Sequence, residues 1–130
     1  MSKWRREAAE RLPELKRIIA SRIVDNPMML WIELNQEFER LSNTEPIQLE
    51  LMKRIWNYCK WCMAHKSQDV QTAAALGFAE HLLDSESRRK ILPKIIGRSD
   101  FLSLRSLLEY HNSSDKVDVF LNSAWNIHQK

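Results

Sequence analysis

Apolar residues recur every three or four positions along most of the chain, and this spacing constrains the fold more than any other feature. The clearest example is the stripe formed by Leu30, Trp31, Leu34, Phe38 and Leu41. Such spacing places the side chains on one face of a helix. The alternation of apolar and polar residues that marks a strand never extends beyond a few residues. With only two glycines and four prolines for tight turns, the sequence predicts an all-α protein.

Capping residues and prolines divide the chain into about seven helices. The first is expected to run to about Val24. Because Pro13 lies inside it, the stretch before Leu12 is either a separate short helix or a kinked extension. Asn26 and Pro27 are typical of an N-cap and a first helical residue, so we expect the second helix to begin there.

Five further helices follow from the same signals. They are expected over residues 47–66 with Thr44 as N-cap, from Ser67 or Asp69 to residue 84, from Ser85 to Gly97 with Pro93 shortening or bending the helix, and over residues 100–111 and 115–128 with Ser99 and Ser114 as N-caps. The short, polar connections favour antiparallel neighbours. We therefore expect a single all-α domain over residues 1–130, built as stacked helical hairpins or as a compact bundle, with the stacked hairpins favoured.

The charged residues are nearly balanced, and opposite charges are interspersed. There are 20 Lys and Arg and 17 Asp and Glu, for a net charge of +3. The densest basic cluster consists of Arg88, Arg89, Lys90, Lys94 and Arg98. One interpretation is a phosphate-binding patch. A solvated helix face is favoured, because no aromatic side chain lies within the cluster to stack on bases, so nucleic acid is not the expected partner.

Neither a membrane span nor a signal peptide is recognisable. No apolar run approaches the roughly 18 residues that a membrane helix needs. The N-terminal segment MSKWRREAAERL is charged throughout and has no apolar stretch. We therefore expect a cytoplasmic protein without membrane contact, in which the two cysteines are reduced thiols.

The segment YCKWCMAH at residues 58–65 has the outline of a metal or redox site. A redox pair lies at a helix N-terminus after a strand, whereas Cys59 and Cys62 lie deep inside a predicted helix. A structural zinc ion needs four ligands, and the remaining histidines are scattered singly along the sequence. Because both thiols fall on the apolar face of this helix, we interpret them as core residues and predict no metal and no cofactor.

Two pairs of carboxylates and one tryptophan are the candidate partner-binding residues. Glu33 and Glu37 are one helical turn apart, as are Glu80 and Asp84 on a later predicted helix. Alternate helices of a stack line the same face, so these four groups are expected to form one acidic surface. Trp61 lies outside the apolar face of the intervening helix, and we expect it to be the apolar anchor of this acidic surface. The alternative is that this tryptophan covers an edge of the core.

No catalytic signature accompanies these residues. A carboxylate pair needs a concave site and a defined partner for acid–base catalysis, and the sequence predicts neither. The nucleophile elbow, the glycine-rich phosphate loop and the HExxH motif are all missing from the sequence. We therefore expect a binding protein and not an enzyme.

Three segments resemble small bacterial all-α immunity proteins of polymorphic and contact-dependent growth-inhibition toxin systems. They are NPMMLWIELNQEF at 26–38, YCKWC at 58–62 and DVQTAAALGFAEHLLD at 69–84. The resemblance implies a non-enzymatic cytoplasmic protein that binds and blocks one cognate toxin domain, often a nuclease. The alternative function is a helical nucleic-acid-associated or regulatory adaptor protein.

Overall fold

The computed structural model describes residues 2–125, and within them the chain forms nine α-helices and three short 3₁₀ helices. Their bounds are α1 (Lys3–Arg11), η1 (Pro13–Leu15), α2 (Lys16–Ile19), α3 (Pro27–Ser42), α4 (Leu49–Met63), α5 (Gln68–Gly77), η2 (Ala79–His81), α6 (Glu86–Ile91), η3 (Leu92–Lys94), α7 (Arg98–Ser103), α8 (Arg105–Leu108) and α9 (Ser114–Ser123). This part of the chain contains no strand, so the all-α prediction is confirmed. The α-helix count exceeds seven because the first and the sixth predicted helices are each divided in two.

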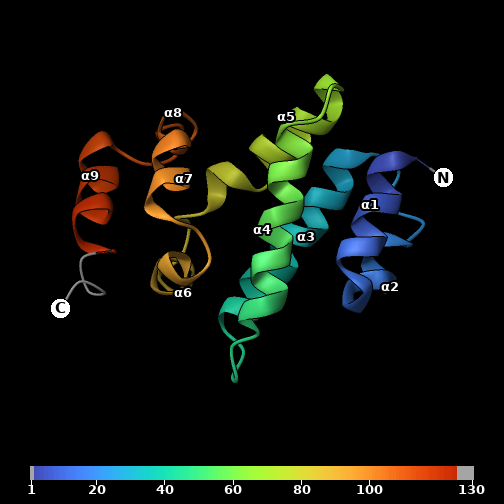
Figure 1. The fold of residues 1–130 in the computed structure, drawn as a ribbon, viewed down its shortest axis with the longest axis horizontal. Helices are drawn as coiled ribbons and strands as arrows, with labels where there is room; N and C mark the ends of the chain where they lie inside the picture. The colour runs from blue at the N-terminus through green and yellow to red at the C-terminus, as the bar shows by residue number, and fades with distance from the viewer. Residues whose placement is uncertain (1, 126–130) are drawn as a thin grey trace.

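The helices lie in a row along the long axis of the molecule (Figure 1). Helices α1 and α2 form one end, α3, α4 and α5 form the centre, and α9 forms the other end. One apolar core runs through the row, from Ala8 in α1 to Leu121 in α9. At the centre, α5 packs against both α3 and α4. No helix among the described residues is long and apolar enough to cross a membrane.

Helix α3 begins and packs as predicted. The side-chain oxygen of Asn26 accepts a hydrogen bond from the Met29 N–H at 2.9 Å, and all five residues of the predicted apolar stripe are buried. Trp31 lies at the centre of this stripe. Its ring stacks on Tyr58 of α4, with centroids 5.3 Å apart, and contacts Phe78 after α5 at 5.1 Å. Aromatic contacts between α3, α4 and the end of α5 therefore form the middle of the core.

The first predicted helix is wrong in its extent. The stretch before Leu12 forms the separate helix α1, and the helix after Pro13 ends at Ile19 instead of near Val24. The reason is a long-range contact, because the Arg5 guanidinium of α1 donates hydrogen bonds to the main-chain oxygens of Ile19 and Val24. The bond to Ile19 satisfies a carbonyl group that a helix continued to Val24 would have used, and the bond to Val24 holds the segment that follows α2.

The fourth predicted helix ends earlier than expected, at Gly77 instead of residue 84. A side chain at position 77 would place its Cβ only 2.8 Å from the Cβ of Trp31, so α5 approaches α3 too closely for any residue but glycine. After this close approach the chain turns, and Phe78 packs edge-on against Phe38 with ring centroids 4.9 Å apart. The short helix η2 follows in place of the predicted helix.

Two N-caps between α3 and α6 have different outcomes. Ser85 caps α6 as predicted, because its hydroxyl accepts a hydrogen bond from the Arg88 N–H at 3.3 Å. Thr44 does not cap α4. Its hydroxyl donates to the main-chain oxygen of Arg40 at 2.6 Å, and α4 begins only at Leu49.

The caps near the C-terminal end also differ from the prediction. Gly97 does not end a helix but precedes α7 as its N-cap, so Ser99 lies inside that helix. The N-cap of α9 is Ser113, whose hydroxyl accepts a hydrogen bond from the Lys116 N–H at 3.1 Å, one residue before the predicted Ser114. The predicted extension of this helix to residue 128 lies outside the described residues.

Both cysteines belong to the core, as the sequence predicts. Cys59 and Cys62 are buried free thiols on the inner face of α4. Burial raises the pKa of the Cys59 thiol well above its ordinary value. Burial also raises the pKa of the Cys62 thiol, to about 11, although hydrogen bonds with Tyr58 and Trp31 oppose this rise. Thiols with such pKa values stay protonated at neutral pH and are poor nucleophiles.

Candidate partner-binding surface

The predicted acidic pair of α3 lies away from α6. Glu39 faces α6, because the Arg88 side chain of that helix donates to its carboxylate. At about 100° per residue, Glu33 and Glu37 project roughly 120° to 160° away from Glu39 around the helix axis. Glu37 is also engaged, since its carboxylate forms an ion pair with Arg40. The flank of α3 that carries this pair is therefore not the flank that meets α6.

The second predicted pair, Glu80 and Asp84, is not on one helix. The early end of α5 places Glu80 in η2 and Asp84 in the turn that follows. Each carboxylate contacts a histidine: Glu80 Oε1 lies 2.7 Å from His111 Nε2, and Asp84 Oδ2 lies 2.7 Å from His81 Nδ1. The structure thus joins this pair to two histidines.

Trp61 is partly buried on the surface of α4. Its ring stacks on Tyr58 with centroids 5.9 Å apart and contacts the His65 ring at 5.0 Å. Lys3 and Lys66 line the same shallow cavity. The surroundings of Trp61 are therefore basic and aromatic, in contrast to the predicted acidic surface, and its ring covers an edge of the core while keeping part of its surface accessible.

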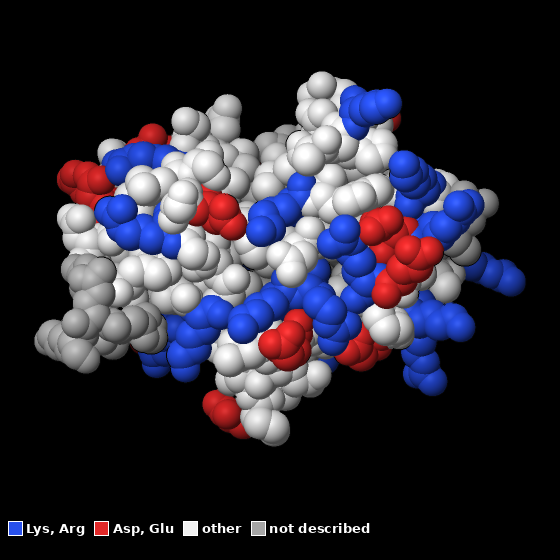
Figure 2. All heavy atoms as spheres, viewed as in Figure 1, with Lys and Arg blue, Asp and Glu red and all other residues white. Residues whose placement is uncertain are grey.

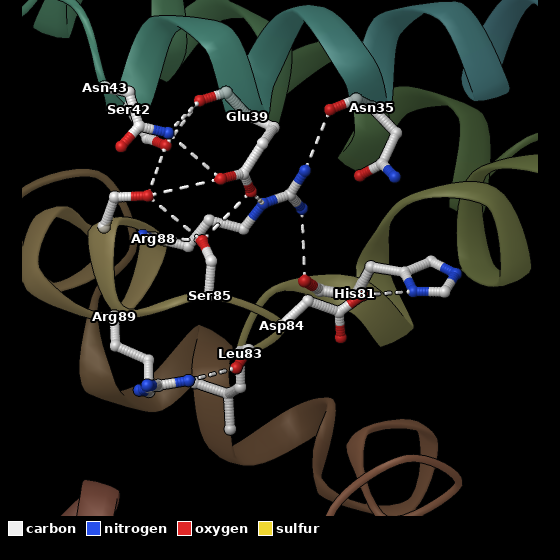
Figure 3. A network of polar contacts seen from close by, with 11 residues as sticks. Asn35, Glu39, Ser42, Asn43, His81, Leu83, Asp84, Ser85, Arg88 and Arg89 are labelled. Carbon is white, nitrogen blue, oxygen red and sulfur yellow. Dashed lines mark hydrogen bonds and ion pairs between the residues drawn. The ribbon is translucent and has the colours of Figure 1, made fainter.

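The basic cluster is solvated only in part. Lys90, Lys94 and Arg98 are exposed as predicted, whereas Arg88 is buried. Its side chain is 2% exposed, and its guanidinium lies over the Phe38 ring, 5.2 Å from the centroid. Nε donates to Glu39 Oε1 at 2.7 Å, while Nη1 and Nη2 donate to the main-chain oxygens of His81 and Asn35 at 3.1 and 2.8 Å (Figure 3). Arg88 therefore ties α6 to α3 and to η2.

Two neighbours in the cluster are also engaged. Arg89 Nη1 donates to the main-chain oxygen of Leu83 at 2.7 Å (Figure 3). Lys90 lies 3.6 Å from the Glu86 carboxylate in an exposed pair. Much of the positive charge in this segment thus serves internal contacts or faces an acidic neighbour.

Three serines complete the network around Glu39. The Ser85 hydroxyl donates to Glu39 Oε1 at 3.0 Å, and the Ser87 hydroxyl lies 3.3 Å from Glu39 Oε2 and 2.9 Å from the Ser42 hydroxyl (Figure 3). Burial works to raise the pKa of the Glu39 carboxyl, but the hydrogen bonds from Arg88 and Ser85 outweigh it and lower this pKa below its ordinary value. The carboxylate is therefore charged at neutral pH and held in one place.

An open groove of about 630 Å³ lies beside this network, between the end of α3 and α6. We call it the α3–α6 groove. Its lining includes the three network serines and Glu39, Glu45, Ile47, Glu86, Lys90 and Lys94. Charges of both signs, hydroxyl groups and a half-buried aliphatic side chain thus meet in one concave surface. This mixture is typical of the polar part of a protein interface, whereas a nucleic-acid site gathers positive charge.

Sequence reasoning missed Glu39 and the groove. A signal for Arg88 is present, because it precedes Ile91, Leu92 and Ile95 at spacings of three, four and seven residues and so shares their apolar face. An arginine in that position predicts a buried ion pair. Its partner Glu39, separated by 49 residues, has no local signature.

Charges on the surface are mixed, as the sequence predicts. Figure 2 shows one face, on which Lys and Arg side chains extend from the region of α6 toward α1 and α2, with acidic side chains among them. Comparison of the chain with protein-family models, curated proteins and solved structures gave no match.

Proposed function

We propose that this chain is a non-enzymatic protein-binding module, an immunity protein that binds and neutralises a cognate bacterial toxin domain in the cytoplasm. The observation that carries the proposal is the α3–α6 groove, whose mixed-charge surface is held in place by the buried Arg88 and its partner Glu39. A surface that is already ordered loses little conformational entropy on binding. The resemblance of residues 26–38, 58–62 and 69–84 to immunity proteins supports the same function.

The main alternative is a nucleic-acid-associated or regulatory adaptor protein that uses the basic cluster. Burial of Arg88 argues against it, since a buried guanidinium is inaccessible to phosphate. The hydrogen bond from Arg89 to the main-chain oxygen of Leu83 likewise occupies part of the Arg89 guanidinium that phosphate would need. We expect binding to a generic duplex to be nearly lost at physiological ionic strength. A gel-shift experiment that finds tight, sequence-selective binding there would favour the alternative.

Enzymatic activity has little support in the groove. A general acid or base at neutral pH needs a pKa near 7, whereas the pKa of the Glu39 carboxyl is lowered. The nearby Ser85 and Ser87 hydroxyls donate to this weakly basic carboxylate, and their two oxygens lie 3.1 Å apart. These groups are arranged for rigidity and recognition.

The groove recognises a partner through two kinds of contact. Glu45 and Glu86 are exposed carboxylates that accelerate the approach of a basic toxin surface, since charges at an interface rim act mainly on the association rate. Ile47 is half-buried and supplies apolar contact, which acts mainly on the dissociation rate. The two kinds of substitution therefore have different kinetic effects.

The test measures both rates between the purified chain and the toxin domain encoded beside its gene. Glu45→Lys combined with Glu86→Lys should slow association several-fold at low salt, and Ile47→Ala should speed dissociation. Glu10→Lys is the matched control, because Glu10 is an exposed carboxylate of α1 near the other end of the row (Figure 1). It should change neither rate.

A second set of variants tests the surface predicted from sequence. Trp61→Ala should speed dissociation and Glu33→Lys with Glu37→Lys should slow association if that surface binds the toxin. Effects in this set, with none in the groove set, would show that the groove is the wrong surface. If the toxin domain does not bind the unaltered chain at all, the proposed function is wrong.

A further inference from the structure

Three metal-ligating side chains from two parts of the chain meet outside the α3–α6 groove. Glu80 and His81 lie in η2, and His111 lies 31 residues after Glu80, just beyond α8. One ligating atom from each lies within 4.8 Å of the other two. We call this group the His–Glu cluster. Residues so far apart in sequence converge only through the fold, so the sequence contains no metal-ligand spacing for this group.

The ligating atoms are directed at one another. His111 Nε2 lies 2.7 Å from Glu80 Oε1, and His81 Nε2 lies 3.7 Å from the same oxygen. The two imidazole rings stack with centroids 4.9 Å apart and an interplanar angle of 24°. Two ring nitrogens and a carboxylate oxygen therefore share one small volume at the surface.

A fourth side chain orients one of these ligands. Asp84 Oδ2 lies 2.7 Å from His81 Nδ1 (Figure 3). In the tautomer with the proton on Nδ1, the Asp84 carboxylate accepts this N–H and the Nε2 lone pair is free to ligate a metal. Histidines that ligate metals usually donate their other N–H to a carboxylate or a carbonyl in this way.

The backbone on both sides of the cluster is anchored. Arg88 donates to the main-chain oxygen of His81 at 3.1 Å, which fixes η2 to α6 (Figure 3). On the other side, Leu108 is fully buried, and the buried Asn112 donates to its main-chain oxygen at 2.9 Å. Helix α8 also packs against η2. The distance between the two parts of the cluster is therefore set by the fold.

We propose that Glu80, His81 and His111 bind a zinc ion, with Asp84 orienting His81. Two imidazole nitrogens and one carboxylate oxygen form a ligand set that Zn²⁺ accepts, with water in the fourth position. Tetrahedral ligands at zinc bond lengths lie about 3.3 Å apart, and Glu80 Oε1 lies 2.7 and 3.7 Å from the two ring nitrogens. Rotation of the His111 side chain, which is 43% exposed, closes the remaining gap. The apolar core does not depend on this ion, so the metal adds stability to a chain that folds without it.

Isothermal titration of the chelator-treated full chain with zinc tests the proposal. We expect one saturable site per chain and a rise in melting temperature with one equivalent of zinc. His111→Ala and Glu80→Gln should each abolish this binding, and Asp84→Asn should weaken it about ten- to hundredfold. The matched control is His65→Ala, because His65 contacts Trp61 and the Ser67 N–H instead of the cluster.

Cobalt absorption distinguishes this site from the cysteines. Bound Co²⁺ should give the visible bands of a nitrogen and oxygen site without a thiolate charge-transfer band. Circular dichroism shows whether each variant is folded, and His111→Ala keeps the test valid if a change in η2 disturbs the fold, since His111 is exposed. The proposal is wrong if the unaltered chain shows no saturable zinc binding, if zinc binding survives in His111→Ala, or if the cobalt spectrum shows thiolate ligation.

Discussion

Replacing Arg88 or Glu39 should destabilise the protein in a coupled way. Arg88→Met retains most of the side-chain volume but removes three hydrogen bonds, so the Glu39 carboxylate loses its countercharge and the main-chain oxygens of His81 and Asn35 lose this donor. Loss of one partner of a buried ion pair costs about 3–5 kcal/mol. Because the Glu39 side chain is 39% exposed and regains water, we expect the lower end, about 3 kcal/mol.

Glu39→Gln should lower the free energy of unfolding for a different reason. It keeps an acceptor for Arg88 Nε but leaves the guanidinium, which is 2% exposed, without a countercharge. We expect a loss of about 2 kcal/mol, within the range for hydrogen bonds to charged groups. The double variant removes both charges, so its destabilisation should be at least about 1 kcal/mol smaller than the sum of the two single values.

Urea unfolding at pH 7, followed by circular dichroism, measures these free energies. The exposed pair of Lys90 and Glu86, 3.6 Å apart, is the matched control, and its coupling should stay below about 0.5 kcal/mol. The pKa of the Glu39 carboxyl is lower in the folded state, so the Arg88–Glu39 coupling is fully present above pH 4.5 and fades as the pH falls through the folded pKa. A coupling no larger than that of the control pair would refute the structural role of Arg88.

Further substitutions test the fold at three separate places. Cys59→Ala and Cys62→Ala should each lower the free energy of unfolding by about 1 kcal/mol or somewhat more, and neither thiol should react with a thiol reagent in the native protein. Gly77→Ala should lower the free energy of unfolding by about 1–3 kcal/mol, because its Cβ would lie 2.8 Å from the Cβ of Trp31. Gly97→Ala is the control and should leave the stability nearly unchanged, because no atom lies within 4 Å of the new Cβ. Equal effects of the two substitutions would show that α3 and α5 approach less closely than described. Hydrogen bonds from Arg54 lower the pKa of Glu14 from 4.5 to about 2, so the folded state binds fewer protons than the unfolded state in that window. The unaltered protein should therefore lose stability as the pH falls from 4.5 to 2, and Glu14→Gln should flatten that part of the stability profile.

The helices with local signals were predictable from the sequence. Helix α3 has a capping asparagine, a proline at its first position and an apolar stripe, and all three act within one segment. The burial of Cys59 and Cys62 was predictable for the same reason, since only the phase of one helix decides it. Local chemistry thus accounts for the elements that the sequence predicted correctly.

The early helix ends and the functional sites depend on contacts between distant segments. Helix α5 ends at Gly77, where α3 approaches it closely, and α2 ends at Ile19, whose main-chain oxygen accepts a hydrogen bond from Arg5 of α1. The partners of Arg88 and of His111 lie 49 and 31 residues away. Nothing in the local pattern identifies such partners, so the Glu39 network and the His–Glu cluster are visible only in the folded chain.

The central claim is that this chain binds and neutralises a toxin domain, and co-expression tests it most directly. The toxin domain encoded beside this gene is expressed in bacteria with and without the chain, and the purified pair is examined by size-exclusion chromatography. We predict that the chain restores growth and that the two proteins elute as one complex. Unchanged growth inhibition in the presence of the folded chain, with the two proteins eluting separately, would contradict it.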